Sequence, residues 1–116
     1  MMNITVASTK SAPWQGSDGV ITEGATTDED TDTVGFKAIL IRGLDTVYVR
    51  NTANSAFQRL ISSYVDVQYN ALLDLAATKN IYSPSWTGPP PKQFTSWGQL
   101  AALDVVVASL NTSPKA

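Results

Sequence analysis

The stretch ANSAFQRLISSYVDVQYNALLDLAA, residues 53–77, decides the fold class. Its apolar residues recur at spacings of three and four, and neither glycine nor proline interrupts it, so it predicts one long amphipathic helix. Val67, Tyr69 and Leu73 widen the apolar face beyond the stripe of about 100° that a helix wet on one side needs. We therefore expect this helix to have neighbours on two sides, as in a layered helical ring.

A second helix is predicted upstream, over residues 33–51. Its apolar residues again follow a helical spacing: Phe36, Ile39, Leu40, Leu44, Val47 and Tyr48. Asp32 or Thr33 is the expected N-cap, because short polar side chains accept hydrogen bonds from the first free amides of a helix. The acidic residues just before this position lie favourably at the positive end of the helix dipole.

A third helix is predicted to start at Ser96, where Gln99 stands three residues on and completes a capping box. We expect its large apolar side chains to point inward: Leu100, Leu103, Val106, Val107 and Leu110. The preceding loop, residues 78–95, contains three consecutive prolines at 89–91, which no helix can continue. The resulting plan is an all-α fold with three main helices.

Residues 1–32 form a different region from the helical part, residues 33–116. They contain six of the ten carboxylates and no sustained helical or alternating pattern, so we expect a loop-rich acidic arm. Val20 and Ile21 are expected to make a brief strand or a loop anchor, and Trp14 to pack on a partner surface.

Composition excludes several classes of function. The net charge of −2 comes without a basic patch, so we expect no nucleic-acid partner. The absence of cysteine and histidine excludes thiol catalysis, imidazole metal sites and Ser-His-Asp chemistry. The acidic run 28–32 begins like a calcium loop, but Thr33 and Ile39 stand where that loop requires glycine and glutamate. We expect no metal, no cofactor and, since no run of eighteen apolar residues occurs, no membrane span.

Three motifs in order resemble the last part of glycoside hydrolase family 76. Residues 19–23 read GVITE and, after the acidic loop, residues 35–42 read GFKAILIR. Residues 80–89 read NIYSPSWTGP, and residues 99–104 read QLAALD. They are similar to the family's strand-like piece ending in glutamate with its "F-K-G-I" helix, to its "W-x-G-P" loop and to its closing helix. Ala38 stands where the family usually has glycine.

The resemblance implies an (α/α)6 toroid, of which this chain would supply only the last hairpin and a half. Family members include endo-acting α-1,6-mannanases, so the implied partner is carbohydrate of the α-mannan type. The family's catalytic unit is an adjacent Asp-Asp pair on an earlier helix, and no Asp-Asp dipeptide occurs here. We expect no catalytic residue in this chain, no activity from it alone, and a missing N-terminal part of the same domain as a partner. The family suggests a secreted or cell-surface location, although Met1 does not open a signal peptide.

Five residues are candidates for substrate contact. Phe36 and Lys37 lie in the first turn of a helix that the resemblance places at the sugar cleft; the alternative is a core Phe beside a surface Lys. Trp86 is either a sugar-stacking platform or a loop anchor, and Trp97 has the same two interpretations. Glu23 either contacts a substrate hydroxyl or is an exposed loop carboxylate.

Three hypotheses for the function remain open. The first is the C-terminal fragment of an α-mannan hydrolase, which lines the sugar cleft without its catalytic pair. The second is a non-catalytic sugar-binding module. The third is a structural helical protein that pairs with another chain through the exposed face of the 53–77 helix. On any of them, we expect Arg42 to pair with a carboxylate such as Asp45 or Asp66.

Overall fold

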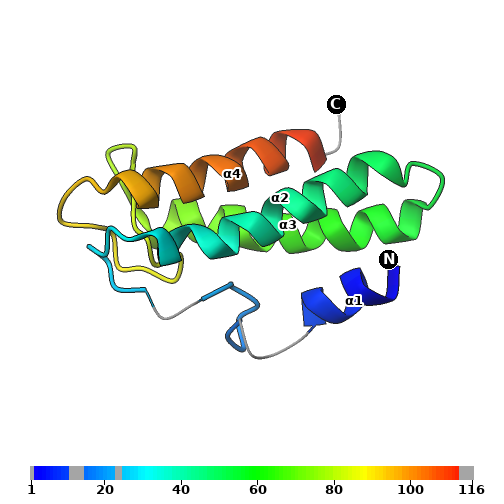
Figure 1. Ribbon diagram of the computed structural model, residues 1–116, viewed down its shortest axis with the longest axis horizontal. Coiled ribbons are helices and arrows are strands. Elements are labelled where there is room, and N and C mark those ends of the chain that lie inside the picture. Colours follow the sequence, from blue (N-terminus) through cyan, green and yellow to red (C-terminus); the bar gives the residue numbers. More distant parts are fainter. Residues whose placement is uncertain (1, 11–14, 23–24, 113–116) are drawn as a thin grey trace.

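The computed structural model describes residues 2–10, 15–22 and 25–112, and within these ranges it confirms the all-α prediction (Figure 1). The helices are α1 (Met2–Lys10), α2 (Phe36–Arg50), α3 (Ser55–Leu75) and α4 (Ser96–Thr112). A 3-10 turn, η2 (Asp32–Gly35), leads directly into α2. Two short strands, β1 (Ala77–Thr78) and β2 (Ile81–Tyr82), pair antiparallel after α3.

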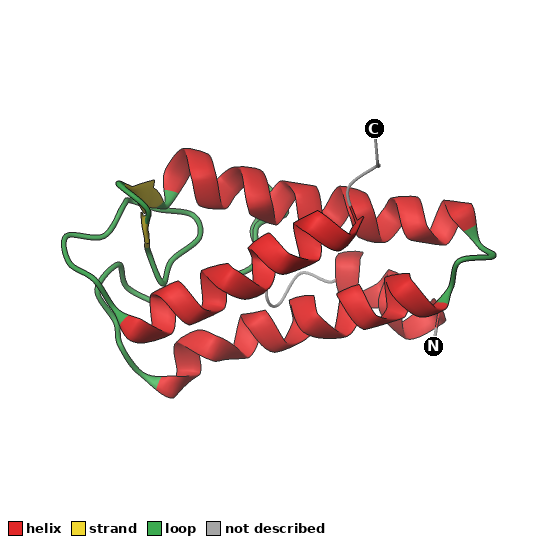
Figure 2. Cartoon of the chain, turned by 90° about the horizontal axis from the view of Figure 1, so that it is seen from above, coloured by secondary structure: helices red, strands yellow, loops and turns green. Residues whose placement is uncertain are grey.

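Helices α2, α3 and α4 lie lengthwise beside one another and enclose the core (Figure 1, Figure 2). A short turn joins α2 to α3, α4 packs against both, and α1 packs against α3. The centre of the bundle is made of aliphatic side chains with no exposed surface: Val34, Ile41, Ile61, Val65, Leu72 and Val105. Burial of each contributes roughly 1.5–3 kcal/mol, which makes this contact zone the main source of stability.

The long helix α3 begins and ends two residues inside its predicted bounds. Asn54 caps it, because its Oδ1 accepts a hydrogen bond from the Phe57 amide at 3.0 Å. The buried side chains lie on one stripe at helical spacing: Phe57, Ile61, Tyr64, Val65, Gln68, Ala71 and Leu72. The extra apolar residues that widen the face, Val67 and Leu73, remain 39% and 42% exposed.

The predicted orientation of α4 is wrong. Leu100, Leu103, Val107 and Leu110 were expected inward and are instead 55%, 56%, 44% and 73% exposed. The buried face carries small residues: Gly98, Ala101, Ala102, Val105, Ala108, Ser109 and Thr112. Small side chains allow α4 to lie close against α2 and α3, and the apolar sequence all round this helix gives no contrast between its faces.

The N-terminal arm is only partly a loop, because it begins with the nine residues of α1, which the sequence pattern did not predict. The expectation for Val20 and Ile21 is confirmed: both are buried, and Ile21 bridges to Gln15. The fully buried Gln68 of α3 holds this segment, since its amide accepts from Ile21 N at 2.9 Å and donates to Gly19 O at 2.8 Å. Trp14 lies outside the described residues.

The acidic loop caps α4 and not α2. No side-chain cap precedes η2 or α2, so the predicted N-cap at Asp32 or Thr33 is wrong. Instead, Asp30 Oδ1 accepts a hydrogen bond from the Trp97 amide in the first turn of α4, at 3.0 Å. Asp28 Oδ1 accepts from Lys92 N at 3.2 Å. The carboxylates therefore tie the arm to the loop before α4, where the helix dipole favours negative charge.

The predicted capping box at the start of α4 is also wrong. Thr95 Oγ1 accepts the Gly98 amide at 3.3 Å, which makes Thr95 the capping residue. The Gln99 side chain turns away from the helix end: its Oε1 accepts from Tyr82 N at 2.6 Å and its Nε2 donates to Asn80 O at 3.2 Å. Gln99 thus fastens the β1–β2 hairpin to α4.

Candidate ligand groove between α2 and α4

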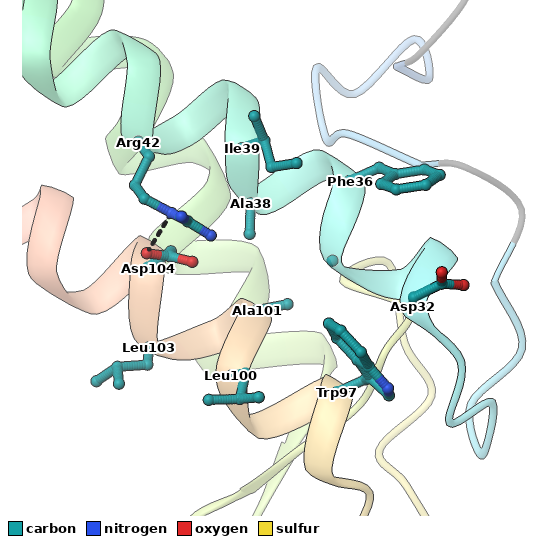
Figure 3. Close-up of a pocket in the computed structure, with 11 residues that line it drawn as sticks. Asp32, Phe36, Ala38, Ile39, Arg42, Trp97, Leu100, Ala101, Leu103 and Asp104 are labelled. Carbon is teal, nitrogen blue, oxygen red and sulfur yellow. Dashed lines mark ion pairs between the residues drawn. The ribbon is translucent and has the colours of Figure 1, made fainter.

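A groove of about 430 Å³ lies between the first halves of α2 and α4 (Figure 3). Its size is within the range of small-ligand sites. Phe36, Ile39 and Arg42 form the α2 wall, and Trp97, Leu100 and Leu103 form much of the α4 wall. Ala38 and Ala101 lie at its floor, both 1% exposed. The first and the third motif of the resemblance, far apart in the sequence, therefore supply the two walls.

Two aromatic side chains border the groove at the end where α2 and α4 begin. Phe36 is 58% exposed and Trp97 is 37% exposed. The Trp97 ring lies over Gly35, where a Cβ atom would stand 3.2 Å from the ring atom Cζ3. Glycine at this position thus gives the indole its place beside the start of α2. An exposed aromatic face is the surface on which the apolar side of a sugar ring packs, as on other flat apolar ligands.

The polar groups of the groove come from both helices and from η2. Arg42 Nε lies 3.1 Å from Asp104 Oδ1, across the gap between α2 and α4 (Figure 3). The predicted pairing with Asp45 or Asp66 is wrong, because α4 brings Asp104 alongside α2. Asp32 lies at the other end of the groove. Carboxylates and a guanidinium beside aromatic rings offer both acceptors and donors to ligand hydroxyl groups.

Lys37 and Trp86 meet beneath α2 and not in the groove. Lys37 is 4% exposed and Trp86 is 1% exposed. The Lys37 ammonium lies 5.0 Å from the centroid of the indole ring and donates a hydrogen bond to Val34 O at 3.2 Å. Such a cation–π contact between desolvated groups is worth about 2 kcal/mol. The pair joins the motif NIYSPSWTGP, which contains Trp86, to the motif GFKAILIR, which contains Lys37. It anchors the 83–91 loop against the bundle.

The burial of Lys37 and Trp86 removes both side chains from the surface of the groove. The structure reverses the alternative of a core Phe beside a surface Lys, since Phe36 is exposed and Lys37 is buried. Direct sugar contact by Lys37 or Trp86 stays a prediction. It would require a rearrangement that exposes these side chains. Glu23 lies outside the described residues. Of the five candidates, Phe36 and Trp97 line the groove.

The turn between Trp86 and α4 is shaped by glycine. Gly88 has φ of +80°, and a Cβ there would collide with the carbonyl oxygen of Leu75 at the end of α3. The loop therefore packs directly on the backbone that ends α3, at a distance that a side chain would not allow. The W-x-G-P motif has a packing role here that is independent of any ligand.

Sequence reasoning gave too little weight to the α4 wall. Trp97 had the same two interpretations as Trp86, and the groove role of Arg42 and Asp104 was not foreseen. One signal was available: α4 is apolar on every side, which is typical of a helix with neighbours on more than one face. Among the described residues no cluster of three or more acidic, histidine or cysteine side chains suits a metal ion.

No helix in the described ranges combines the length and the apolar character needed to cross a membrane. Comparisons with protein-family models, with curated proteins and with solved structures found no match for this chain.

Proposed function

We propose that this chain is the C-terminal part of a glycoside hydrolase domain of the family 76 type, and that its groove between α2 and α4 contacts α-mannan. In this proposal the chain forms part of the wall of a sugar cleft and does not supply the catalytic carboxylate pair. Activity would require the remaining helices of the domain, contributed by sequence outside residues 1–116.

The observation that carries the proposal is the origin of the two groove walls. Phe36 and Arg42 belong to the motif GFKAILIR, whereas Leu100 and Asp104 belong to the motif QLAALD. Motifs that resemble one family in sequence thus meet at a single groove. The exposed rings of Phe36 and Trp97 provide apolar faces, and the Arg42–Asp104 pair provides hydrogen-bonding groups beside them.

The absence of an Asp-Asp dipeptide supports the non-catalytic part of the proposal. A retaining glycosidase needs two carboxyl groups roughly 5–5.5 Å apart, one of them with a raised pKa. Three of the four carboxylates in the acidic loop accept hydrogen bonds from backbone amides: Asp28 from Lys92 N, Asp30 from Trp97 N, and Glu29 from Thr26 N. These carboxylates therefore have a structural role, whereas a catalytic carboxyl group would protonate a leaving group.

Calorimetric titration with α-1,6-linked mannose oligomers tests the proposal. We expect measurable heat at millimolar sugar, abolished by Phe36→Ala. Phe94→Ala is the matched control, because Phe94 is 60% exposed and does not line the groove. No heat in the wild-type chain, or equal losses in the two variants, would overturn the assignment of the groove. Hydrolysis of α-1,6-mannan above the buffer rate would overturn the assignment as non-catalytic.

A non-catalytic sugar-binding module is the second candidate, and the same groove favours it. The two candidates differ in what happens when the chain is combined with an upstream segment that carries an Asp-Asp pair on a predicted helix. Appearance of mannanase activity in the combined domain supports the enzyme fragment. Unchanged sugar binding without hydrolysis supports the binding module.

A further inference from the structure

The outer face of α4 carries a continuous apolar seam. Leu100, Leu103, Val107 and Leu110 follow one another at intervals of three, four and three residues, and each is between 44% and 73% exposed. This is the spacing of the a and d positions of a heptad, which place side chains along one side of a helix. From residue 100 to residue 110 the seam is about 15 Å long at 1.5 Å per residue.

Packing among the described residues does not account for this seam. The opposite face of α4 makes the contacts with α2 and α3 through small residues such as Ala101, Val105 and Ala108. A helix that is apolar on all sides is normally surrounded by other structure. Moreover, an exposed contiguous patch of large aliphatic side chains typically marks an interaction site.

We propose that a second copy of this chain covers the seam, with the two α4 helices antiparallel about a twofold axis. In this arrangement Leu100 faces Leu110 of the second copy, and Leu103 faces Val107 of the second copy. In an antiparallel pair the positive end of each helix dipole lies beside the negative end of the other, which is favourable. A twofold axis places the same patch of both chains in contact.

The residues that flank the seam allow two identical copies to meet, because they carry almost no charge. The positions that correspond to e and g of the heptad, where charges normally select partners, hold Gln99, Asp104, Val106 and Asn111. Asp104 is the only charged residue of α4, and Arg42 of the same chain neutralises it at 3.1 Å. Two copies therefore meet without repulsion between like charges, and the seam carries no charge pattern that would select a charged partner helix.

The exposed apolar area is of the size that a dimer needs. A standard interface buries about 800 Å² on each partner. The four seam residues, together with the half-exposed Phe36, Ile39 and Trp97 at their edge, each retain on the order of 100 Å² of apolar surface. These seven side chains supply most of the required area.

The dimer goes beyond the proposed sugar groove and does not depend on it. Leu100 and Leu103 belong to both surfaces, so a second copy and a sugar ligand would compete. Val107 and Leu110 lie outside the groove lining. The double variant Val107→Gln/Leu110→Gln therefore weakens the dimer while it leaves the groove residues in place.

Sedimentation equilibrium over micromolar to millimolar chain concentration tests the proposal. We expect reversible association to twice the 12.4 kDa chain mass. Val107→Gln/Leu110→Gln should weaken it about a hundredfold or more, since each substitution acts twice in a symmetric dimer. Val67→Gln/Leu73→Gln is the matched control, because the same residue types on α3 are 39% and 42% exposed. Circular dichroism of both variants verifies that helix content is retained.

Cross-linking then tests the orientation, and the cysteine-free sequence makes it specific. An equal mixture of Leu100→Cys and Leu110→Cys chains should give predominantly the mixed disulfide. Homogeneous disulfides from each variant alone would overturn the antiparallel arrangement. A wild-type chain that stays monomeric, that associates without limit, or that loses its dimer equally in both double variants would overturn the proposal. In each of these cases the sugar titration, carried out on Val107→Gln/Leu110→Gln, still gives an independent answer.

Discussion

Substitution of Gly88 by alanine perturbs the loop that anchors Trp86 under the bundle. Gly88 has φ of +80°, and the added Cβ would collide with the Leu75 carbonyl oxygen. The left-handed backbone costs an L-residue about 1–2 kcal/mol, and forcing the loop away from the end of α3 adds an overpacking cost of about 1–3 kcal/mol. We therefore expect Gly88→Ala to lower the free energy of unfolding by about 2–5 kcal/mol.

Urea denaturation, followed by circular dichroism and tryptophan fluorescence, measures this loss. Gly43→Ala is the matched control, since Gly43 lies in the middle of α2 and a Cβ there meets nothing within 4 Å. Alanine is the better helix former by about 1 kcal/mol, so the control should be at least as stable as the wild type. A Gly88→Ala chain within about 0.5 kcal/mol of the wild type would refute the packing assigned to this loop, because that range is typical of harmless surface changes.

Three further predictions follow from single contacts. Gln68→Leu should cost about 2–4 kcal/mol, because it leaves the buried amide of Ile21 and the part-buried carbonyl of Gly19 without their partner. Asp30→Ala should cost about 0.5–1.5 kcal/mol, because the Trp97 amide and the dipole of α4 lose a carboxylate; a thermal melt measures it. Burial raises the pKa of Tyr64 to about 12, so stability should be full below pH 10, the tyrosine value in the unfolded chain, and fall by up to about 2 kcal/mol as the pH rises to 12.

Each of these three has an outcome that contradicts it. Gln68→Leu as stable as the wild type would mean that the arm does not pack on α3. Asp30→Ala with unchanged melting would mean that the acidic loop does not hold the start of α4. For Tyr64, the Tyr64→Phe chain should lose less stability between pH 10 and 12 than the wild type, and identical pH profiles would remove the burial argument.

Strong periodicity made α3 predictable. Residues 53–77 carry apolar residues at helical spacing, and α3 occupies Ser55–Leu75 with Phe57, Ile61, Val65 and Leu72 buried. Val67, Leu73 and Leu75 remain exposed, so the pattern specified the helix and the centre of its buried face but not the width of that face. The acidic residues were expected at the N-terminus of α2, whereas Asp30 caps α4. The sequence could not indicate this, because Asp30 lies next to α2 in sequence and reaches α4 only in the folded chain.

The sequence could not predict which face of α4 is buried, and the reason is physical. Its leucines and its alanines form two apolar faces, so no hydrophobic contrast tells which one turns inward. Close packing against two helices selects the alanine face, and this depends on the distance between helices. The lining of the groove also depends on how α4 packs. Phe36 could be identified from its motif, whereas Trp97 and Asp104 line the groove only because α4 lies alongside α2.

Chemical-shift mapping of the amide resonances during titration with an α-1,6-linked mannose oligomer tests the sugar groove most directly. We predict that the shifted amides cluster at the first turns of α2 and α4, around Phe36, Ile39, Trp97 and Asp104, with the face of α3 around Val67 and Leu73 unchanged. Shifts that cluster elsewhere, or none at millimolar sugar, would contradict the account.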